Sequence, residues 1–445
     1  MDIVGLIPDF GSLIGTILAF VVALSVIVAI HEYGHYIVGR WSGIEADVFS
    51  IGMGPVLAAR RDRRGTLWQI AAFPVGGYVK FRGDADAASV TAADSSGLDA
   101  EARRQTMAGA PLWARAATVA AGPAFNFLLS IAVFAVVLTI RGVASDPFTV
   151  AEVRSLPGME TRIEAGDRLL SIAGRDVPAM EDLGGFYDAL PVEPRLPYVV
   201  ERDGQRMEID GPYPYPPIVG GVTPQSAAAA ADLSAGDVIT AVDGREIFAF
   251  AELRDIVGDS DGETLSLTVW RAGEGTREVS LSPRRMDLPL PEGGFETRWL
   301  IGITGGMYLT PETVTPGPLS ALGFAVGQVW YIIESSLSGL WHMAAGAISS
   351  CNLQGPIGIA QTSGAAASAG ALSFVWFIAV LSTAVGFINL FPIPVLDGGH
   401  LVLYAYEAVV GRAPPERALN VLMAAGIALI GTLMIFAVTN DLFCP

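Results

Sequence analysis

The chain has 445 residues, 51% of them hydrophobic, and a mean hydropathy of +0.48. A chain this apolar is not an ordinary soluble protein, and its length allows several modules. The formal net charge of −18 at pH 7 argues against a nucleic-acid-binding protein, which needs a basic surface. The two cysteines, Cys351 and Cys444, have no metal-binding spacing and form no disulfide framework.

Four stretches are long and apolar enough to cross a membrane, which takes about 20 residues. They are residues 12–36, 114–140, 371–396 and 418–439. The flank before the first, MDIVGLIPDFG, is acidic, whereas a cleavable signal peptide needs a basic one. Arginines concentrate in the loop between the first two spans and recur between the last two. The positive-inside rule then predicts that both loops are cytoplasmic and that both termini and the long segment 141–370 lie outside.

The first span ends in the motif HEYGH, residues 31–35, which places ionisable side chains after a run of Val, Ile and Ala. Histidines four residues apart share one face of a helix, so His31 and His35 can bind one zinc ion. Glu32 would lie beside them as general base for the attacking water. The alternative is a histidine pair packed between helices, but ionisable groups inside a membrane usually mark function.

Residues 41–113 follow as a cytoplasmic or membrane-associated β region. Within it, residues 48–81 predict apolar strands on both sides of a basic turn, Arg60–Gly65. A helical substrate hides its carbonyls in hydrogen bonds, so it must unwind before hydrolysis. An edge strand here would hold the unwound segment by β-addition. The alternative is a hairpin that only packs.

Segment 141–310 contains an internal repeat, because EAGDRLLSIAGRDV at 164–177 aligns with SAGDVITAVDGREI at 234–247. Each copy has a turn, an alternating strand and a glycine turn. The repeat resembles two tandem PDZ domains in circularly permuted order, residues 147–215 and 216–308. PDZ domains usually accept an extended peptide beside a sheet edge, and the alternative is a bulky gate over the active site. A ligand role for the Gly220–Gly221 pair competes with a plain turn or bulge.

The third span leads into GFINLFPIPVLDGGH, residues 386–400. Two histidines do not complete a catalytic zinc site, which usually has three protein ligands and a water. Asp397 is the only acid within or at the end of this span, so it is the best candidate for the third ligand. The prolines of the P-I-P sequence resist a helix, and Gly398 and Gly399 allow unusual backbone angles, so we expect the chain to unwind here. The alternative for Asp397 is a polar cap at the helix end.

A fifth apolar stretch, residues 321–344, is expected to lie on or near the membrane surface. Parity supports this expectation. His31 and Asp397 each lie near the C-terminal end of a span, so those two spans must be parallel if the residues are to meet at one depth. An odd number of crossings must then separate them, and the span 114–140 already supplies one.

An H-E-x-x-H motif in a first span, with N-x-x-P-x-P-x-L-D-G in a later one, here Asn389 to Gly398, resembles the site-2 protease family of intramembrane zinc metalloproteases. The resemblance covers nearly the whole chain and is closest to the bacterial regulator of sigma-E protease type. It implies that His31, His35 and Asp397 hold Zn²⁺ and that Glu32 is the base. It also implies that Asn389 contacts the substrate or polarises the reacting carbonyl. The alternative for Asn389 is a hydrogen bond that holds the unwound segment.

The remaining histidines and the cysteines are not expected to bind zinc. We expect His400 to support the site from outside the ligand set or to add polarity at the helix end, and His342 to lie on a polar helix face. With the topology above, Cys351 and Cys444 both lie outside, where a disulfide can persist. The alternative is two unrelated thiols.

We therefore predict an α-helical polytopic membrane protein with four transmembrane helices, a membrane-associated β region and two extracytoplasmic PDZ domains of α+β fold. The predicted segments are 1–40, 41–113, 114–141, 147–215, 216–308, 316–365, 371–400 and 418–439. The predicted function is zinc-dependent intramembrane proteolysis in a bacterial inner membrane, with both termini and the PDZ domains on the periplasmic side. The resemblance implies a single-span substrate, such as an anti-sigma factor, that a first protease has trimmed. The rival is a zinc-handling transporter or PDZ scaffold, but a transporter needs ligands across the bilayer and the ionisable groups here cluster at one depth.

Overall fold

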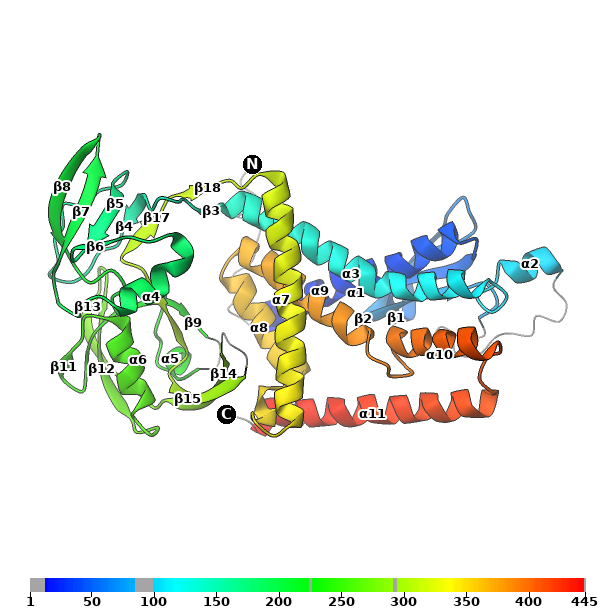
Figure 1. Ribbon diagram of the computed structural model, residues 1–445. Helices are drawn as coiled ribbons and strands as arrows, with labels where there is room; N and C mark the ends of the chain where they lie inside the picture. The colour runs from blue at the N-terminus through cyan, green and yellow to red at the C-terminus, as the bar shows by residue number, and fades with distance from the viewer. Residues whose placement is uncertain (1–12, 85–98, 224–225, 291–293, 444–445) are drawn as a thin grey trace. The chain divides into compact units, whose positions relative to one another are not determined.

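The computed structural model describes residues 13–84, 99–223, 226–290 and 294–443. The chain forms two compact units (Figure 1). The first consists of residues 1–137, 318–341 and 350–445, and the second of residues 138–317 and 342–349. The acidic flank before the first span and Cys444 lie outside the described residues. Cys351 is disulfide-bonded, and its pairing with Cys444 stays a prediction.

The first unit is mainly helical. Its helices are α1 (Leu13–Trp41), α2 (Ala100–Arg104), α3 (Leu112–Arg141), α7 (Pro318–Ala344), the 3₁₀ turn η3 (Ser350–Asn352), α8 (Pro356–Ser368), α9 (Ala371–Asn389), α10 (Asp397–Val410) and α11 (Glu416–Phe443). Among the described residues, α1, α3, α9 and α11 are long and apolar enough to cross a membrane. The four-span prediction agrees with this, and α7 is not one of the four. The protein is therefore a membrane protein that also carries substantial β structure.

The helix of the third span ends before the predicted end of that span at residue 396. Helix α9 ends at Asn389 and α10 begins only at Asp397, so the expected unwinding is confirmed for residues 390–396 (Figure 1). The expectation of unusual backbone angles at the two glycines is wrong, because both lie in the first turn of α10. They are needed for space instead. A Cβ on Gly398 would lie 2.2 Å from the Leu390 carbonyl oxygen, and one on Gly399 would lie 2.3 Å from that of Ile393.

The bounds of the first span also differ from the prediction, since α1 continues to Trp41 rather than ending at residue 36. Small residues let α1 and α3 approach closely, as is common between helices in membranes. A Cβ on Gly34 of α1 would lie 2.5 Å from the Ala121 carbonyl oxygen of α3. Apolar side chains of α1 and α9 complete the contact, with Ile27 packed near Ile378. The HEYGH turn is thus held directly against α3.

Strands β1 (Ala46–Arg61) and β2 (Leu67–Phe81) fold into more than a simple hairpin. Phe49 pairs with both Val79 and Trp68, and Arg60 also pairs with Trp68. The segments therefore lie in the order 77–81, 46–51, 67–71 and 56–61 across the sheet. The ring of Tyr36 on α1 packs 5.1 Å from that of Trp68 and 5.7 Å from that of Phe49, which fixes the sheet to the zinc-motif helix.

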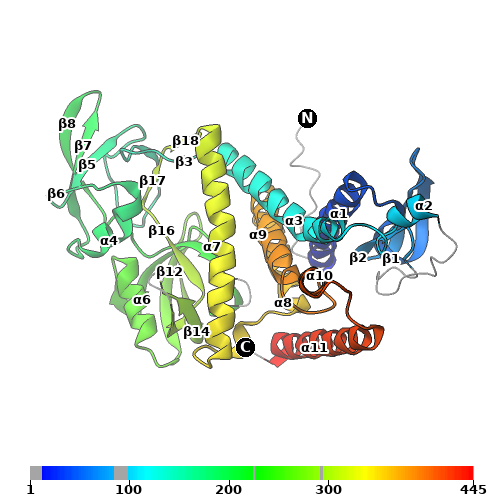
Figure 2. The same cartoon turned by 45° about the vertical axis from the view of Figure 1, so that its right-hand side comes forward.

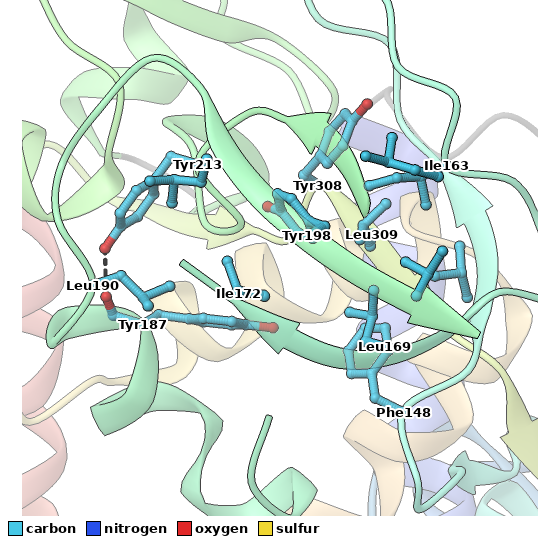
Figure 3. Packing of buried hydrophobic residues seen from close by; sticks show 14 of the residues in the cluster. Phe148, Ile163, Leu169, Ile172, Tyr187, Leu190, Tyr198, Tyr213, Tyr308 and Leu309 are labelled. Atoms are coloured by element: carbon cyan, nitrogen blue, oxygen red, sulfur yellow. Dashed lines mark hydrogen bonds between the residues drawn. The ribbon is translucent and has the colours of Figure 1, made fainter. Parts of the chain in front are cut away.

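The second unit contains two β cores. The first core is built from β4 (Val150–Val153), β5 (Arg168–Ile172), β6 (Arg175–Asp176), η2 (Met180–Asp182), α4 (Leu183–Asp188), β7 (Leu196–Arg202), β8 (Gln205–Gly211) and β17 (Leu309–Pro311). Its strands run in the order β6-β5-β7-β8, with β4 paired to β17. Tyrosines fill much of this core, and the Tyr213 hydroxyl donates to the Tyr187 carbonyl (Figure 3). Tyr308 and Leu309 also belong to it, although they follow the second repeat in the chain.

The second core comprises β9 (Ile218–Val222), α5 (Ala227–Ala230), β10 (Val238–Val242), β11 (Arg245–Glu246), α6 (Phe250–Gly258), β12 (Leu265–Arg271), β13 (Gly275–Leu281) and β16 (Ile303–Gly306). The sheet order is β13-β12-β10-β9-β16, with β11 beside β10, and α6 packs beside β12 through Leu253 and Val257 (Figure 2). A hairpin, β14 (Arg284–Pro289) and β15 (Phe295–Leu300), precedes β16. Gly220 and Gly221 lie within β9, opposite a register shift in β16, so they form a strand with a bulge rather than a turn.

The repeated A-G-D turn has the same role in both cores. Asp167 accepts two hydrogen bonds from Arg202, and Asp237 accepts two from Arg271. Burial alone would raise the pKa of Asp237. The hydrogen bonds from Arg271 and from the Ser234 N–H outweigh burial and hold that pKa below its ordinary value. The sequence repeat is thus a structural repeat as well.

Candidate active site

Three side chains of metal-ligating type from two helices meet in the first unit. His31 and His35 lie one turn apart on α1, with their Nε2 atoms 3.1 Å apart. Asp397 is the first residue of α10, and its Oδ2 lies 3.2 Å from His31 Nε2 while its Oδ1 lies 3.5 Å from His35 Nε2. One donor atom from each of the three residues falls within 4.8 Å of the others. Asp397 thus directly follows the interruption between α9 and α10, and its carboxylate faces the two histidines of α1.

The chemistry of this cluster fits a zinc ion. Asp397 Oδ2 is buried and has no hydrogen-bond partner in the described part of the chain. His35 donates from Nδ1 to the Thr118 carbonyl, 2.9 Å away, so its Nε2 carries the lone pair that faces the cluster. Lone pairs that converge at these distances repel each other unless a cation lies between them. Two imidazoles and a carboxylate, with a fourth position left for water, form a typical catalytic zinc set.

Glu32 lies beside the cluster but does not belong to it, since the three-residue group contains only the histidines and Asp397. The backbone of Val79 in β2 hydrogen-bonds the Glu32 carboxylate. Gly77 makes this approach possible, because a Cβ there would lie 2.9 Å from Val28 Cγ1 and 3.2 Å from Glu32 Cγ. Residues 77–81, the last part of β2 and the outermost segment in the order given above, therefore lie against the side of α1 that carries the site.

A cavity of about 670 Å³ opens at the cluster. Its wall contains the three residues of the cluster, together with Glu32, Asn389, His400 and the strand segment from Gly77 to Val79. Asn389 is the last residue of α9, and its Nδ2 donates to the Val385 carbonyl at 3.0 Å, as expected if it stabilises the helix end. His342 does not line this cavity; it belongs to the second unit, where it packs against Phe295 with ring centroids 5.1 Å apart.

Helix α3 contributes site residues that the sequence analysis missed. A Cβ on Gly122 would lie 2.4 Å from His35 Nε2 and 2.8 Å from His31 Cε1, so only glycine leaves room for both rings. Asn126, one turn later, is fully buried, and its side-chain amide lies 3.2 Å from His31 Nδ1. The stretch AAGPAFN, residues 120–126, contains a usable sequence signal, because Gly-Pro and a polar amide residue are unusual in the middle of an apolar span.

An ion pair fixes α10 to α3. Arg115 donates to both carboxylate oxygens of Glu407, at 2.6 and 3.1 Å, and its guanidinium lies 5.2 Å from the ring centroid of Tyr404. Both charged side chains are largely buried, and a paired fork of this kind has a defined geometry. Because α10 begins with Asp397, the Arg115–Glu407 contact also restrains the position of the Asp397 carboxylate.

Comparisons with known proteins agree with this geometry. The model of peptidase family M50 matches residues 19–433. The chain is 36% identical over 440 residues to a candidate zinc metalloprotease of Agrobacterium fabrum. This alignment covers 97% of each of the two chains. It is 31% identical over 460 residues to the regulator of sigma-E protease RseP of Salmonella typhimurium, which covers 97% of this chain and 99% of that protein.

These matches run through all four candidate spans and both β cores, so they concern the whole architecture rather than one motif. They do not favour the alternative of a transporter or a scaffold without protease activity. The chain therefore belongs to peptidase family M50 and is a zinc-dependent intramembrane protease.

Proposed function

We propose that His31, His35 and Asp397 hold the catalytic zinc ion and that Glu32 is the general base. The observation that carries this proposal is the convergence of the three donor sets at one wall of the cavity, with Glu32 beside them. When bound, zinc supplies Lewis-acid chemistry and makes a water molecule a strong nucleophile near neutral pH. Glu32 takes a proton from the attacking water and passes it to the nitrogen of the departing amide.

The strand segment 77–81 is the proposed binding edge for the unwound substrate. Among the described residues it pairs only with β1, and it borders the cavity beside Glu32. A substrate segment added to this edge would be extended, with its carbonyls released from helical hydrogen bonds. Asn389, which also borders the cavity, is the proposed contact for the substrate or for its reacting carbonyl.

The substrate class follows from the proposed topology. We infer that the two β cores are PDZ domains on the periplasmic side of the inner membrane and that both termini lie on the same side. The substrate is then a single-span membrane protein whose external domain a first protease has removed. The relation to a protein named for regulating sigma-E supports an anti-sigma factor as the substrate.

The direct test is cleavage of a single-span substrate by the purified protein in detergent or liposomes. We expect cleavage inside the span, loss of cleavage after treatment with a zinc chelator, and recovery when zinc is restored. Cleavage that a chelator leaves unchanged would contradict a zinc-dependent reaction. A chelated sample to which magnesium is added instead of zinc is the control for non-specific effects of the chelator.

Removal of the two β cores should relax the choice of substrate. The ends of this region are already adjacent, because β3 (Val143–Ala144) pairs with β18 (Thr313–Val314). Replacing residues 146–311 with a short Gly-Ser turn should therefore leave the entry and exit of the membrane helices in place. We expect this variant to cut a substrate that still carries its large external domain, and we expect the intact protein to leave that substrate uncut.

The measurement compares trimmed and untrimmed substrate for the intact protein and for this variant. Equal cleavage of trimmed substrate shows that the variant is inserted and active. If such a variant still refuses untrimmed substrate, the β cores are not a size filter.

A further inference from the structure

The starting observation is the buried amide of Asn126 on α3. The residue is fully buried, and the amide nitrogen lies 3.2 Å from His31 Nδ1, while Oδ1 has no hydrogen-bond partner in the described part of the chain. The backbone around the side chain is fixed, because the Asn126 carbonyl accepts hydrogen bonds from Ser130 and from Ser382 on α9, at 2.9 and 3.0 Å. The amide thus lies against His31, and a half-turn about the Cβ–Cγ bond would exchange Oδ1 and Nδ2.

The proposed zinc site decides which way the amide must face, and the present inference rests on that site. His31 Nε2 points at Asp397 and His35, so its lone pair is the one that faces a metal ion. A neutral imidazole with a free Nε2 carries its proton on Nδ1. An amide N–H facing this N–H would place two donors 3.2 Å apart. The two ends of an amide have nearly the same shape, so a half-turn costs little space.

We propose that Asn126 presents Oδ1 to the Nδ1–H of His31 and thereby fixes the tautomer and ring orientation that bind zinc. The side chain is a positioning residue, because it acts on the metal through His31 and touches neither substrate nor ion. Hydrogen-bond partners of this kind raise the basicity of the ligand and hold its plane, and their loss commonly lowers metal affinity about 10–100-fold.

The two histidines are held in different ways, which makes the proposal testable. His35 donates to the main-chain carbonyl of Thr118, which no side-chain substitution removes. The orientation of His31 depends on one side chain. Asn126 is therefore a position at which the zinc site can be weakened without changing a ligand, the base or the cavity wall.

A purely structural role is the competing explanation, since Asn126 also lies where α3 contacts α9. The hydrogen bonds to Ser130 and Ser382 use the backbone carbonyl, so they survive any side-chain substitution at this position. Asn126→Leu keeps the number and branching of the side-chain heavy atoms and removes the acceptor. Asn126→Asp keeps an acceptor in the same place. A purely structural role predicts that the apolar leucine is tolerated better than the aspartate. Our proposal predicts the opposite for zinc affinity: the aspartate variant should bind zinc more tightly than the leucine variant.

The experiment uses the full-length protein in detergent, with zinc affinity measured by competition against a chromophoric chelator. We expect Asn126→Leu and Asn126→Ala to lower zinc affinity about 10–100-fold, and Asn126→Asp to stay within a few-fold of wild type. With Co²⁺ in place of zinc, the visible absorption bands should shift in the leucine variant and return in the aspartate variant. Ser130→Ala is the matched control, because it removes a neighbouring hydrogen bond without touching His31.

The proposal is overturned if the leucine variant binds zinc as wild type does, or if the aspartate variant is as weak as the leucine variant. Should the leucine variant fail to fold, the ratio between the alanine and aspartate variants decides in the same way. Failure of the underlying site gives a different result. If Asp397→Ala keeps full zinc affinity, the three-ligand assignment is wrong, whereas if only the Asn126 variants keep it, the ligand set stands and the positioning role falls.

Discussion

Replacement of Glu32 with glutamine is expected to lower the rate of proteolysis by about 10²–10⁴-fold while zinc content stays at the wild-type level. Glutamine has the shape of glutamate but cannot take a proton from the attacking water. It also keeps an oxygen that can accept the hydrogen bond from the Val79 backbone, so the contact between the sheet and α1 survives. Because Glu32 is not one of the three residues whose donor atoms converge, the metal site should be unaffected.

Metal analysis and a cleavage assay on the same purified sample measure both parts of this prediction. Glu334→Gln is the matched control, since it makes the same change in α7, at a residue that does not border the cavity. Loss of zinc in Glu32→Gln would mean that the carboxylate is a ligand, and wild-type activity would mean that it is not the base.

The chemistry of the site could be predicted from the sequence because its donors are rare and confined to short motifs. The chain contains four histidines, and the two in HEYGH are a turn apart on any helix, whatever the fold. Asp397 could be predicted from the sequence for a different reason, since a carboxylate is costly at the end of an apolar span unless it has a function. The structure brings these three residues together.

The surroundings of the site were not predictable in the same way, because they depend on distances between helices. Gly122 and Asn126 lie in an apolar helix rich in small residues, and only the packing of α3 on α1 shows that one makes room for the histidine rings and the other contacts His31. The Arg115–Glu407 pair joins residues 292 positions apart in the chain, and nothing local indicates it. A contact of that range follows from the fold, not from a motif.

The β structure shows a similar division. Alternating apolar residues and turns predict strands on both sides of the basic turn in the region of 48–81, and β1 and β2 lie there. The pairing of Phe49 with two different parts of β2 is a matter of register, which period-two patterns leave open. In the second unit, the A-G-D repeat predicts two similar turns. This is confirmed, because Asp167 and Asp237 each accept hydrogen bonds from an arginine of their own core. Strand β17 lies with the first core because of tertiary pairing with β4.

Replacement of Asp397 with alanine is expected to lower both zinc affinity and activity, by more than the about 10–100-fold that loss of an outer hydrogen-bond partner costs. Two histidines alone leave a catalytic zinc site short of one protein ligand. The rest of α10 should stay in place, because Arg115 still holds Glu407 and the two glycines still pack against the preceding turn. The loss would therefore report on the ligand rather than on an unfolded helix.

The measurement is zinc affinity by chelator competition, with thermal unfolding of the zinc-free protein as the check on folding. His400→Ala is the informative companion, because His400 borders the same cavity, one turn further along α10, and is absent from the three-residue group. We expect His400→Ala to retain zinc and Asp397→Ala to lose it. The opposite pattern would identify His400 as the third ligand and would leave Asp397 as a polar group at the start of a helix. Loss in both variants would mean that the coordination set is larger than the three donors that converge in the structure, and that the fourth position assigned to water is held by the protein.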